Sequence, residues 1–321
     1  MGALARIFEA LAWLGRQGTR AIALSLLVGL ALPPLAALFK PLVAPTIFYL
    51  LVLAFLRVDP AALKSEFSRP GLVLLATLWI MIATPLALGA VYMVLGRGEL
   101  WNALSVALVL QAAAPPIMSA PAFVAILGLD AALALATLIA TVSITPLTAP
   151  FFAAWFVGSA LPLDPGALAL RLFFFLAGAF LVAFVIRRFL GSDRVLAARE
   201  RIDGLSVIGL FVFAVALMES VAVRMFSEPS LVLALLALSF TLTFGLMAFT
   251  TIVFRRAGLE RALALGWESG NRNMGLMLAA AGGVSDLVWL YFALAQFPIY
   301  LGPQLLSPLV HRILGRRLPL G

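Results

Sequence analysis

The hexapeptide Glu-Ser-Gly-Asn-Arg-Asn at residues 268–273 lies in an otherwise apolar stretch, 262–283, that is long enough to cross a membrane. A carboxylate, a guanidinium and two amides are costly at bilayer depth, so their presence indicates a functional site. Gly266 precedes the polar residues and Gly270 lies among them, and we expect the helix to come apart there. Broken helices at mid-membrane expose backbone groups, which many transporters use to bind a substrate or an ion.

The composition indicates a membrane protein rather than a soluble one. The chain has 321 residues, of which 64% are hydrophobic and 11% charged, whereas a soluble domain carries about twice that charge. Its apolar runs leave no room for a separate soluble domain. We therefore expect a polytopic helical protein whose main partner is the lipid bilayer.

Several chemistries are excluded by the residues that are missing. The chain has no cysteine and a single histidine, His311, which excludes disulfides, thiolate metal sites and multi-histidine metal sites. It shows no paired carboxylates, nucleotide-binding loop or Ser/His arrangement. We therefore expect no enzyme activity, no cofactor and no metal site.

Cutting the apolar runs at proline, glycine and charge gives ten helical spans. They are 21–39, 41–57, 71–95, 100–127, 130–157, 166–190, 203–226, 230–254, 260–284 and 286–310. We divide the chain accordingly into an amphipathic N-terminal helix at 1–20, a first five-helix repeat at 21–157, a second repeat at 166–310 and a basic cytoplasmic tail at 311–321. The start of the chain could imitate a signal peptide, but the apolar run after it is longer than a signal core.

The positions of the basic residues orient the spans. Of the 22 Lys and Arg residues, 17 fall on one side of the expected membrane, and four (Lys40, Arg97, Arg171 and Arg224) fall on the other; Arg272 lies within a span. This split predicts that both termini are cytoplasmic. It also explains the net charge of +8 without nucleic acid, because the arginines flank the apolar runs. We expect the inner (cytoplasmic) membrane.

Helix-breaking residues occur at corresponding positions in the two halves of the chain. The span 100–127 is interrupted by Pro115-Pro116 through Pro121, and the span 260–284 by residues 266–273. The next span of each half carries a proline, Pro146 or Pro298. Because five spans is an odd number, the second half must enter the membrane in the opposite sense. The sequence therefore predicts an all-α fold of two inverted repeats whose fourth and ninth helices are broken and cross at mid-membrane, although proline is also common in membrane helices generally.

The polar residues near this crossing have two interpretations each. The span 130–157 carries a stripe of threonines at helical spacing, which either faces the site or satisfies carbonyls of its own helix; its members are Thr137, Thr141, Thr145 and Thr148. Glu268 and Arg272 lie four residues apart, so they pair if the segment stays helical. Such a pair would either sense substrate or protons, or only pin the broken helix.

The arrangement of ten spans with breaks in the fourth and ninth resembles the bile acid:sodium symporter family. The stretch from Glu268 through Asn273-Met-Gly-Leu276 is similar to that family's Glu-x-Gly-x-Gln-Asn-x-Gly-Leu signature. The segment Ala114-Pro115-Pro116, followed by Asp130, Leu133, Pro146 and Pro150, resembles its Ala-Pro-Gly-Gly-Thr-x-Ser-Asn segment and the helix after it. The resemblance implies a core of spans 3–5 and 8–10 and a panel of spans 1, 2, 6 and 7.

The departures from that family concern its two sodium ions. The residues that stand where the family has side-chain ligands are Ala120, Pro121, Ala134, Leu138, Ile80 and Arg272. Only Glu268 clearly survives among those ligands. A positive charge at Arg272 would do the electrostatic work of a bound sodium ion. We therefore expect a symporter scaffold with a degenerate sodium site.

These observations predict a secondary transporter that moves a small or amphipathic organic anion by alternating access, without sodium coupling. The expected site residues are Glu268, Arg272, Asn271, Asn273, Pro116, Ser119, Thr141 and Thr145. Two alternatives remain, a sodium-coupled symporter that uses main-chain oxygens and a non-transporting receptor on the same scaffold. Protons are a further expected partner if the Glu268–Arg272 pair senses them.

Overall fold

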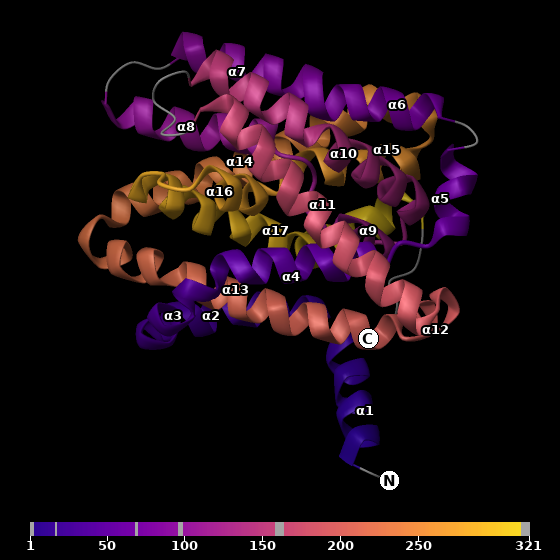
Figure 1. Cartoon of the computed structure of the whole chain (residues 1–321). Coiled ribbons are helices and arrows are strands. Elements are labelled where there is room, and N and C mark those ends of the chain that lie inside the picture. The colour runs from indigo at the N-terminus through magenta and orange to yellow at the C-terminus, as the bar shows by residue number, and fades with distance from the viewer. Residues whose placement is uncertain (1–2, 17, 68–69, 96–98, 158–163, 316–321) are drawn as a thin grey trace. The chain divides into compact units, whose positions relative to one another are not determined.

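The computed structural model describes residues 3–16, 18–67, 70–95, 99–157 and 164–315, and within these ranges it contains helices but no strand. The α-helices in chain order are α1 (Ala3–Arg16), α2 (Gly18–Ala31), α3 (Pro33–Phe39), α4 (Val43–Leu56), α5 (Pro60–Phe67), α6 (Gly71–Leu78), α7 (Thr84–Leu95), α8 (Glu99–Ala113), α9 (Ala120–Ile126), α10 (Ala131–Phe156), α11 (Pro165–Leu190), α12 (Ser192–Ala197), α13 (Arg199–Ser227), α14 (Pro229–Phe254), α15 (Leu259–Gly270), α16 (Met274–Ala281) and α17 (Asp286–Ile313). Figure 1 shows them in place. Four of the basic residues that orient the chain (Arg69, Arg97, Arg316 and Arg317) and the end of the tail expected at 311–321 lie outside the described residues.

Within the described residues, six helical segments are long and apolar enough to cross a membrane. They are Pro33–Leu56, Gly71–Val94, Ala131–Phe156, Pro165–Leu190, Arg199–Ser227 and Pro229–Ala257. The chain is thus an all-helical membrane protein. The expected spans 100–127 and 260–284 do not qualify because each is divided into two helices, and neither half reaches the roughly 20 residues that a single crossing needs.

The expected boundary between the first two spans is wrong. We expected it at Lys40, but there a short 3₁₀ turn, Lys40–Leu42, joins α3 directly to α4. The helix is interrupted instead at Leu32, whose φ of −125° and ψ of 68° are not helical. The cause is the pair Pro33-Pro34, because proline has no N–H to continue a preceding helix but fits the first turn of a new one.

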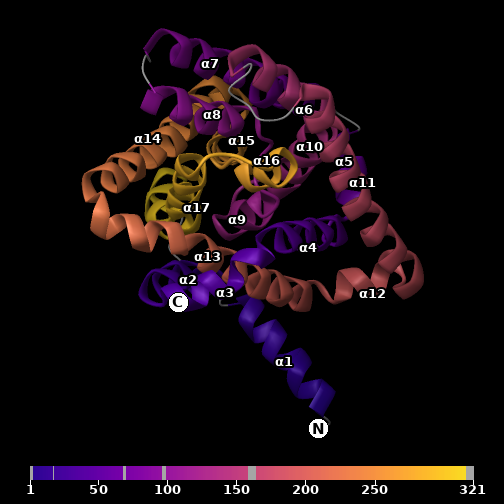
Figure 2. The same ribbon diagram turned by 60° about the vertical axis from the view of Figure 1, so that its left-hand side comes forward.

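The helices divide into two compact units. Unit 1 comprises residues 1–59 and 174–232, and unit 2 comprises residues 60–173 and 233–321. In unit 1, α13 is central and contacts α1, α2, α3 and α4. Both views show the N-terminal end of α1 projecting away from α13 (Figures 1 and 2). The two helices approach closely at Gly204, where an added Cβ would lie 2.0 Å from the Leu11 carbonyl oxygen.

An ion pair in unit 1 holds the end of α4 against α13. The Arg57 guanidinium donates a 3.0 Å hydrogen bond to the Asp203 carboxylate. Burial lowers the pKa of Arg57, and the neighbouring carboxylate acts against that shift.

Unit 2 contains both divided helices and the uninterrupted α10 and α17. The prolines that we used to compare the two halves, Pro146 and Pro298, lie inside these two continuous helices, so they mark no break. A small apolar cluster joins α6, α10, α14 and α15; its buried members are Val73, Ala76, Leu133, Ala136, Phe254, Ala262 and Leu265. This packing fixes the first half of the divided helix that carries Glu268.

The role expected for the glycines of α15 is corrected by the packing of this helix. The helix continues through Gly266 and ends only after Gly270. A Cβ at Gly270 would lie 2.4 Å from the Thr243 carbonyl oxygen, and one at Gly266 would lie 2.6 Å from the Met247 carbonyl oxygen. The two glycines therefore let α15 lie against α14, and the interruption has another cause.

Candidate functional site at the crossing of two divided helices

The two interruptions meet each other at the backbone. Residues 114–119 separate α8 from α9, and residues 271–273 separate α15 from α16. Pro116 and Arg272 form an isolated antiparallel bridge. Two hydrogen bonds flank it, from the Ile117 N–H to the Asn271 oxygen at 2.9 Å and from the Asn273 N–H to the Pro115 oxygen at 2.7 Å. We call these two segments the crossing.

Local sequence explains why both helices stop at the crossing. Pro115 and Pro116 have no N–H, so they cannot donate to the last turn of α8. In the second segment Asn271 adopts an extended conformation, with φ −101° and ψ 94°. Its N–H still donates to the Trp267 oxygen of α15 at 3.1 Å, whereas its C=O points sideways and accepts from the Ile117 N–H of the other interruption. Each break therefore satisfies backbone groups that the other leaves open.

The four half-helices are arranged in two pairs around the crossing. Helix α8 contacts α16, and α9 contacts α15. Figure 1 shows the first pair toward the left of unit 2 and the second pair toward the right. The C-terminal ends of α8 and α15 therefore both face the crossing, and helix C-termini carry partial negative charge.

The Arg272 guanidinium occupies this negative region. Its Nε donates to the Ser269 oxygen at 2.6 Å, and its Nη1 donates to the Ile80 oxygen at 2.9 Å and the Ala114 oxygen at 3.0 Å. The side chain is 4% exposed. Three carbonyls from three segments thus surround one fixed cation, as carbonyl oxygens would surround a bound metal ion.

The carbonyl of Ile80 is free to accept because the helix around it is distorted. Residues Trp79–Ala83 form a π-helical turn in which the Thr84 N–H donates to the Trp79 oxygen. In a regular α-helix that N–H would donate to the Ile80 oxygen. The following residue, Pro85, has no N–H to take its place. The sequence Thr84-Pro85 is the signal that predicts an unpaired carbonyl at Ile80. The family resemblance identifies Ile80 only as an apolar side chain in place of a ligand.

The expected direct ion pair between Glu268 and Arg272 is not formed. In the part of the chain that the structure describes, neither carboxylate oxygen of Glu268 has a hydrogen-bond partner, and the guanidinium donates to carbonyls instead. The pairing required a helix through residue 272, but α15 ends at Gly270. Glu268 is fully buried in the last turn of α15, so it lies near the guanidinium without contacting it.

The two asparagines at the crossing have different roles. The Asn271 side chain donates to the Trp267 oxygen at 2.8 Å, while its own Oδ1 has no described partner. Asn273 precedes the first residue of α16, and its side chain accepts from the Leu276 N–H at 3.0 Å. Asn273 is therefore the N-cap of the second half-helix.

We expect Asn273→Ala to lower the free energy of unfolding by about 1 kcal/mol, the usual contribution of an N-cap side chain. Asn273→Ser should retain most of the stability, because a hydroxyl can accept from the same N–H. Thermal unfolding of the purified protein measures both variants. Equal stability of the alanine and serine variants would contradict the capping role.

The remaining expected site residues make mainly local contacts. Pro116 is buried in the bridge, and Ser119 precedes α9 without a side-chain capping bond. The Thr141 hydroxyl donates to the Thr137 and Leu138 oxygens, and the Thr145 hydroxyl to the Thr141 oxygen, all at 2.8 Å. The structure thus supports the interpretation that these threonines satisfy carbonyls of their own helix.

A polar contact that we did not anticipate connects α8 and α17. The Tyr291 hydroxyl donates to the Gln111 Oε1 at 2.5 Å, and both residues are buried. Gln111 lies in the last turn of α8, just before the interruption. A glutamine in an otherwise apolar span was the available signal.

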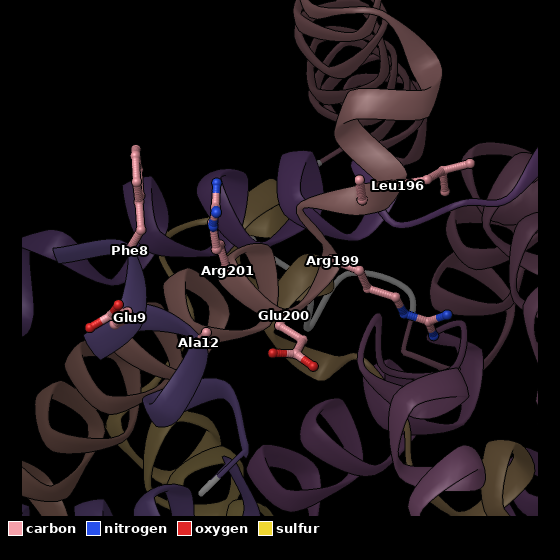
Figure 3. Close-up of a pocket in the computed structure, with 8 residues that line it drawn as sticks. Phe8, Glu9, Ala12, Leu196, Arg199, Glu200 and Arg201 are labelled. Carbon is pink, nitrogen blue, oxygen red and sulfur yellow. The ribbon is translucent and has the colours of Figure 1, made fainter. Parts of the chain in front are cut away.

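A separate cavity lies in unit 1, outside the crossing. It has a volume of about 560 Å³ and is lined by residues of α1, α12 and α13. The side chains of Phe8 and Arg201 lie side by side, whereas those of Glu9 and Arg199 point away from each other (Figure 3). The polar groups around this cavity do not converge on one point, so the crossing is the stronger candidate site.

No protein-family model matches the chain, and no curated protein matches it significantly.

Proposed function

We propose that this protein is a secondary transporter that moves a small or amphipathic organic anion across a membrane by alternating access, without sodium coupling. The observation that carries the proposal is the crossing, where two divided helices exchange backbone hydrogen bonds around a buried arginine. Irregular backbone at membrane depth is costly unless protein or a water-filled cavity surrounds it. Two such interruptions at one point are characteristic of transporter sites.

The contacts of Arg272 support the absence of sodium coupling. A sodium ion at a crossing of this kind would need the carbonyl oxygens that the interruptions release. Here the carbonyls of Ser269, Ile80 and Ala114 already accept from the guanidinium. The fixed cation would also repel a second one. This argument favours sodium independence over the alternative in which main-chain oxygens hold sodium.

An anionic substrate fits the groups that remain at the crossing. The Arg272 Nη2 is buried and has no partner among the described residues. The N-terminal end of α16 also points to this region, and helix N-termini favour negative charge. A carboxylate or sulfonate could accept from both groups. Apolar side chains around them would then contact the rest of an amphipathic substrate.

The division into units supports a mechanism in which two bodies move. Unit 2 contains both divided helices, and unit 1 contains the N-terminal helices and α13. A core and a panel of this composition are what the resemblance to the bile acid:sodium symporter family implies. In this proposal the core holds the substrate, and the panel exposes the crossing to each side of the membrane in turn.

Ion pairs are consistent with the proposed orientation in the inner membrane, with cytoplasmic termini. Lys40 pairs with Glu219 at 2.7 Å, and both belong to the expected external side. Arg261 pairs with Asp130 at 3.1 Å, and both belong to the expected cytoplasmic side. Each pair joins residues of different helices that the proposed topology places toward the same side of the membrane.

Uptake into proteoliposomes tests the transport proposal. We expect a labelled organic anion from a panel of carboxylates and sulfonates to accumulate, and to exchange with unlabelled anion inside. Binding without exchange would favour the receptor alternative instead. If none of the tested anions binds, both the transporter and the receptor proposals are contradicted.

Sodium dependence is a separate prediction on the same preparation. Replacing sodium by potassium or choline should change the affinity for the transported anion less than tenfold, which corresponds to about 1.4 kcal/mol. A larger loss on sodium removal would show that main-chain oxygens still hold the ion, and the built-in cation would not replace it.

A further inference from the structure

None of the hydrogen bonds and ion pairs described above involves the Glu268 carboxylate. It is fully buried, and in the described part of the chain neither oxygen accepts a hydrogen bond. The guanidinium that could neutralise it donates to three carbonyls instead. An ionised carboxylate without hydrogen bonds in a dry interior is costly, and the usual remedies are a cation or a proton.

Among the described residues, the helices packed around α15 place no other charge near Glu268 except at their ends. The helices α9, α10, α14 and α16 contain no Asp, Glu, His, Lys or Arg, and α17, whose Gly302 lies against Trp267, carries such residues only in its first and last turns (Asp286, His311 and Arg312). Arg261 and Glu260 lie at the far end of α15, about 10 Å away along the helix axis, and Arg261 pairs with Asp130. On the other side Arg272 lies four residues further along the chain, beyond the end of α15.

A proton meets the need of this carboxylate better than a metal cation does. A sodium ion would require several oxygen ligands. The Ser269, Ile80 and Ala114 carbonyls already accept from Arg272, which leaves Asn271 Oδ1 and Ser269 Oγ as the side-chain oxygens of residues 269–271 without a described partner. A proton requires no ligand set, because it converts the charged group into a neutral carboxyl. The guanidinium then remains the single net charge at the crossing, available to an anion.

From this geometry we infer that Glu268 is a proton-binding site and that the proton is the coupling ion of the proposed transport, on which this inference rests. Glu268 takes up one proton from water on one side of the membrane and holds it while buried. It releases that proton to water on the other side. With a monovalent anion beside Arg272, the loaded crossing carries a guanidinium, a neutral carboxyl and the anion, and its net charge is zero.

Infrared spectroscopy of the protein in liposomes tests the proton site without any substrate. At neutral pH the wild-type protein should show the C=O stretching band of a protonated carboxyl, and Glu268→Gln should remove it. Glu219→Gln is the matched control, because Glu219 pairs with Lys40, and it should leave the band unchanged. No such band in the wild type, or a band that persists in Glu268→Gln, overturns the site.

Thermal stability gives a second readout that does not depend on spectral assignment. At neutral pH the folded protein holds a proton that the unfolded chain has already released, so raising the pH should destabilise the wild type. Glu268→Gln cannot release a proton, and we expect it to be less sensitive to pH over the same range. Parallel pH profiles for the two proteins would contradict the inference.

Flux measurements separate the coupling from the transport itself. Taurocholate is a suitable amphipathic probe because its sulfonate stays ionised over the pH range used. We expect an inward proton gradient to raise its uptake by the wild type several-fold over the rate without a gradient, whereas for Glu268→Gln the ratio of these two rates should be close to one. Exchange without a proton effect in the wild type overturns the coupling. Absence of exchange by the wild type counts against transport of this anion class, and the infrared result still decides the proton site.

Discussion

Replacing Arg272 by glutamine is expected to lower the free energy of unfolding by about 3–5 kcal/mol, because three buried carbonyls lose a charged hydrogen-bond donor. The guanidinium donates to the Ser269, Ile80 and Ala114 carbonyls, which belong to three different segments. Hydrogen bonds to charged groups contribute about 1.5–3 kcal/mol each, and an unpaired buried acceptor is costly. A glutamine amide is shorter and cannot reach all three. Thermal unfolding of the purified protein measures the loss.

A double variant shows which partner of Arg272 matters. If the carbonyls are its main partners, Glu268→Gln combined with Arg272→Gln should remain almost as unstable as Arg272→Gln alone, because the three acceptors are still unpaired. Recovery of wild-type stability in the double variant would instead mean that charge neutralisation of Glu268 is the main role of the arginine. Arg272→Lys keeps the charge but not the planar fork of donors, and we expect an intermediate stability.

Gly270→Ala should destabilise the protein by about 2–3 kcal/mol, near the upper end of the usual range for overpacking. The added Cβ would lie 2.4 Å from the Thr243 carbonyl oxygen, and a backbone atom cannot move aside as a side chain can. Helix α15 would have to shift away from α14, and the crossing begins one residue later. The same variant should therefore also impair transport.

Gly245→Ala is the matched control for this effect. Gly245 lies on the same helix as Thr243, and a Cβ there would meet nothing within 4 Å. Because alanine favours a helix interior over glycine by about 1 kcal/mol, this control should be neutral or stabilising. If both alanine variants had the same stability, close packing of α15 on α14 would not explain the glycine.

The positions of the two interruptions could be predicted from local sequence, because their causes are local. Pro115-Pro116 removes two N–H donors in succession, and residues 271–273 combine polar side chains that the membrane disfavours. The pairing of Glu268 with Arg272 could not be predicted in the same way. It depended on whether the chain stays helical through residue 272, and the partners that decide this, Pro115 and Ile117, are more than 150 residues away.

Other features of the structure could not be predicted from the sequence, because they depend on contacts between segments that are far apart in the chain or on the extent of a local signal. The role of Gly266 follows from its neighbours on α14, whereas its sequence context equally predicts a flexible joint. The donor bound by the Ile80 carbonyl is the side chain of a residue 192 positions later. Leu32 and Lys40 are both followed by proline. Two prolines follow Leu32 but only one follows Lys40, and the helix is interrupted at Leu32.

The guanidinium at the crossing differs from a bound ion in one thermodynamic respect. A dissociable ion stabilises its site according to its concentration, by RT ln(1 + [L]/Kd), so dilution or a chelating agent can empty the site. Arg272 is covalently attached to the backbone, and its occupancy of the three carbonyls is independent of the ionic composition on either side. The stability of the crossing therefore does not depend on the concentration of any ion. Only a change of conformation can release those carbonyls.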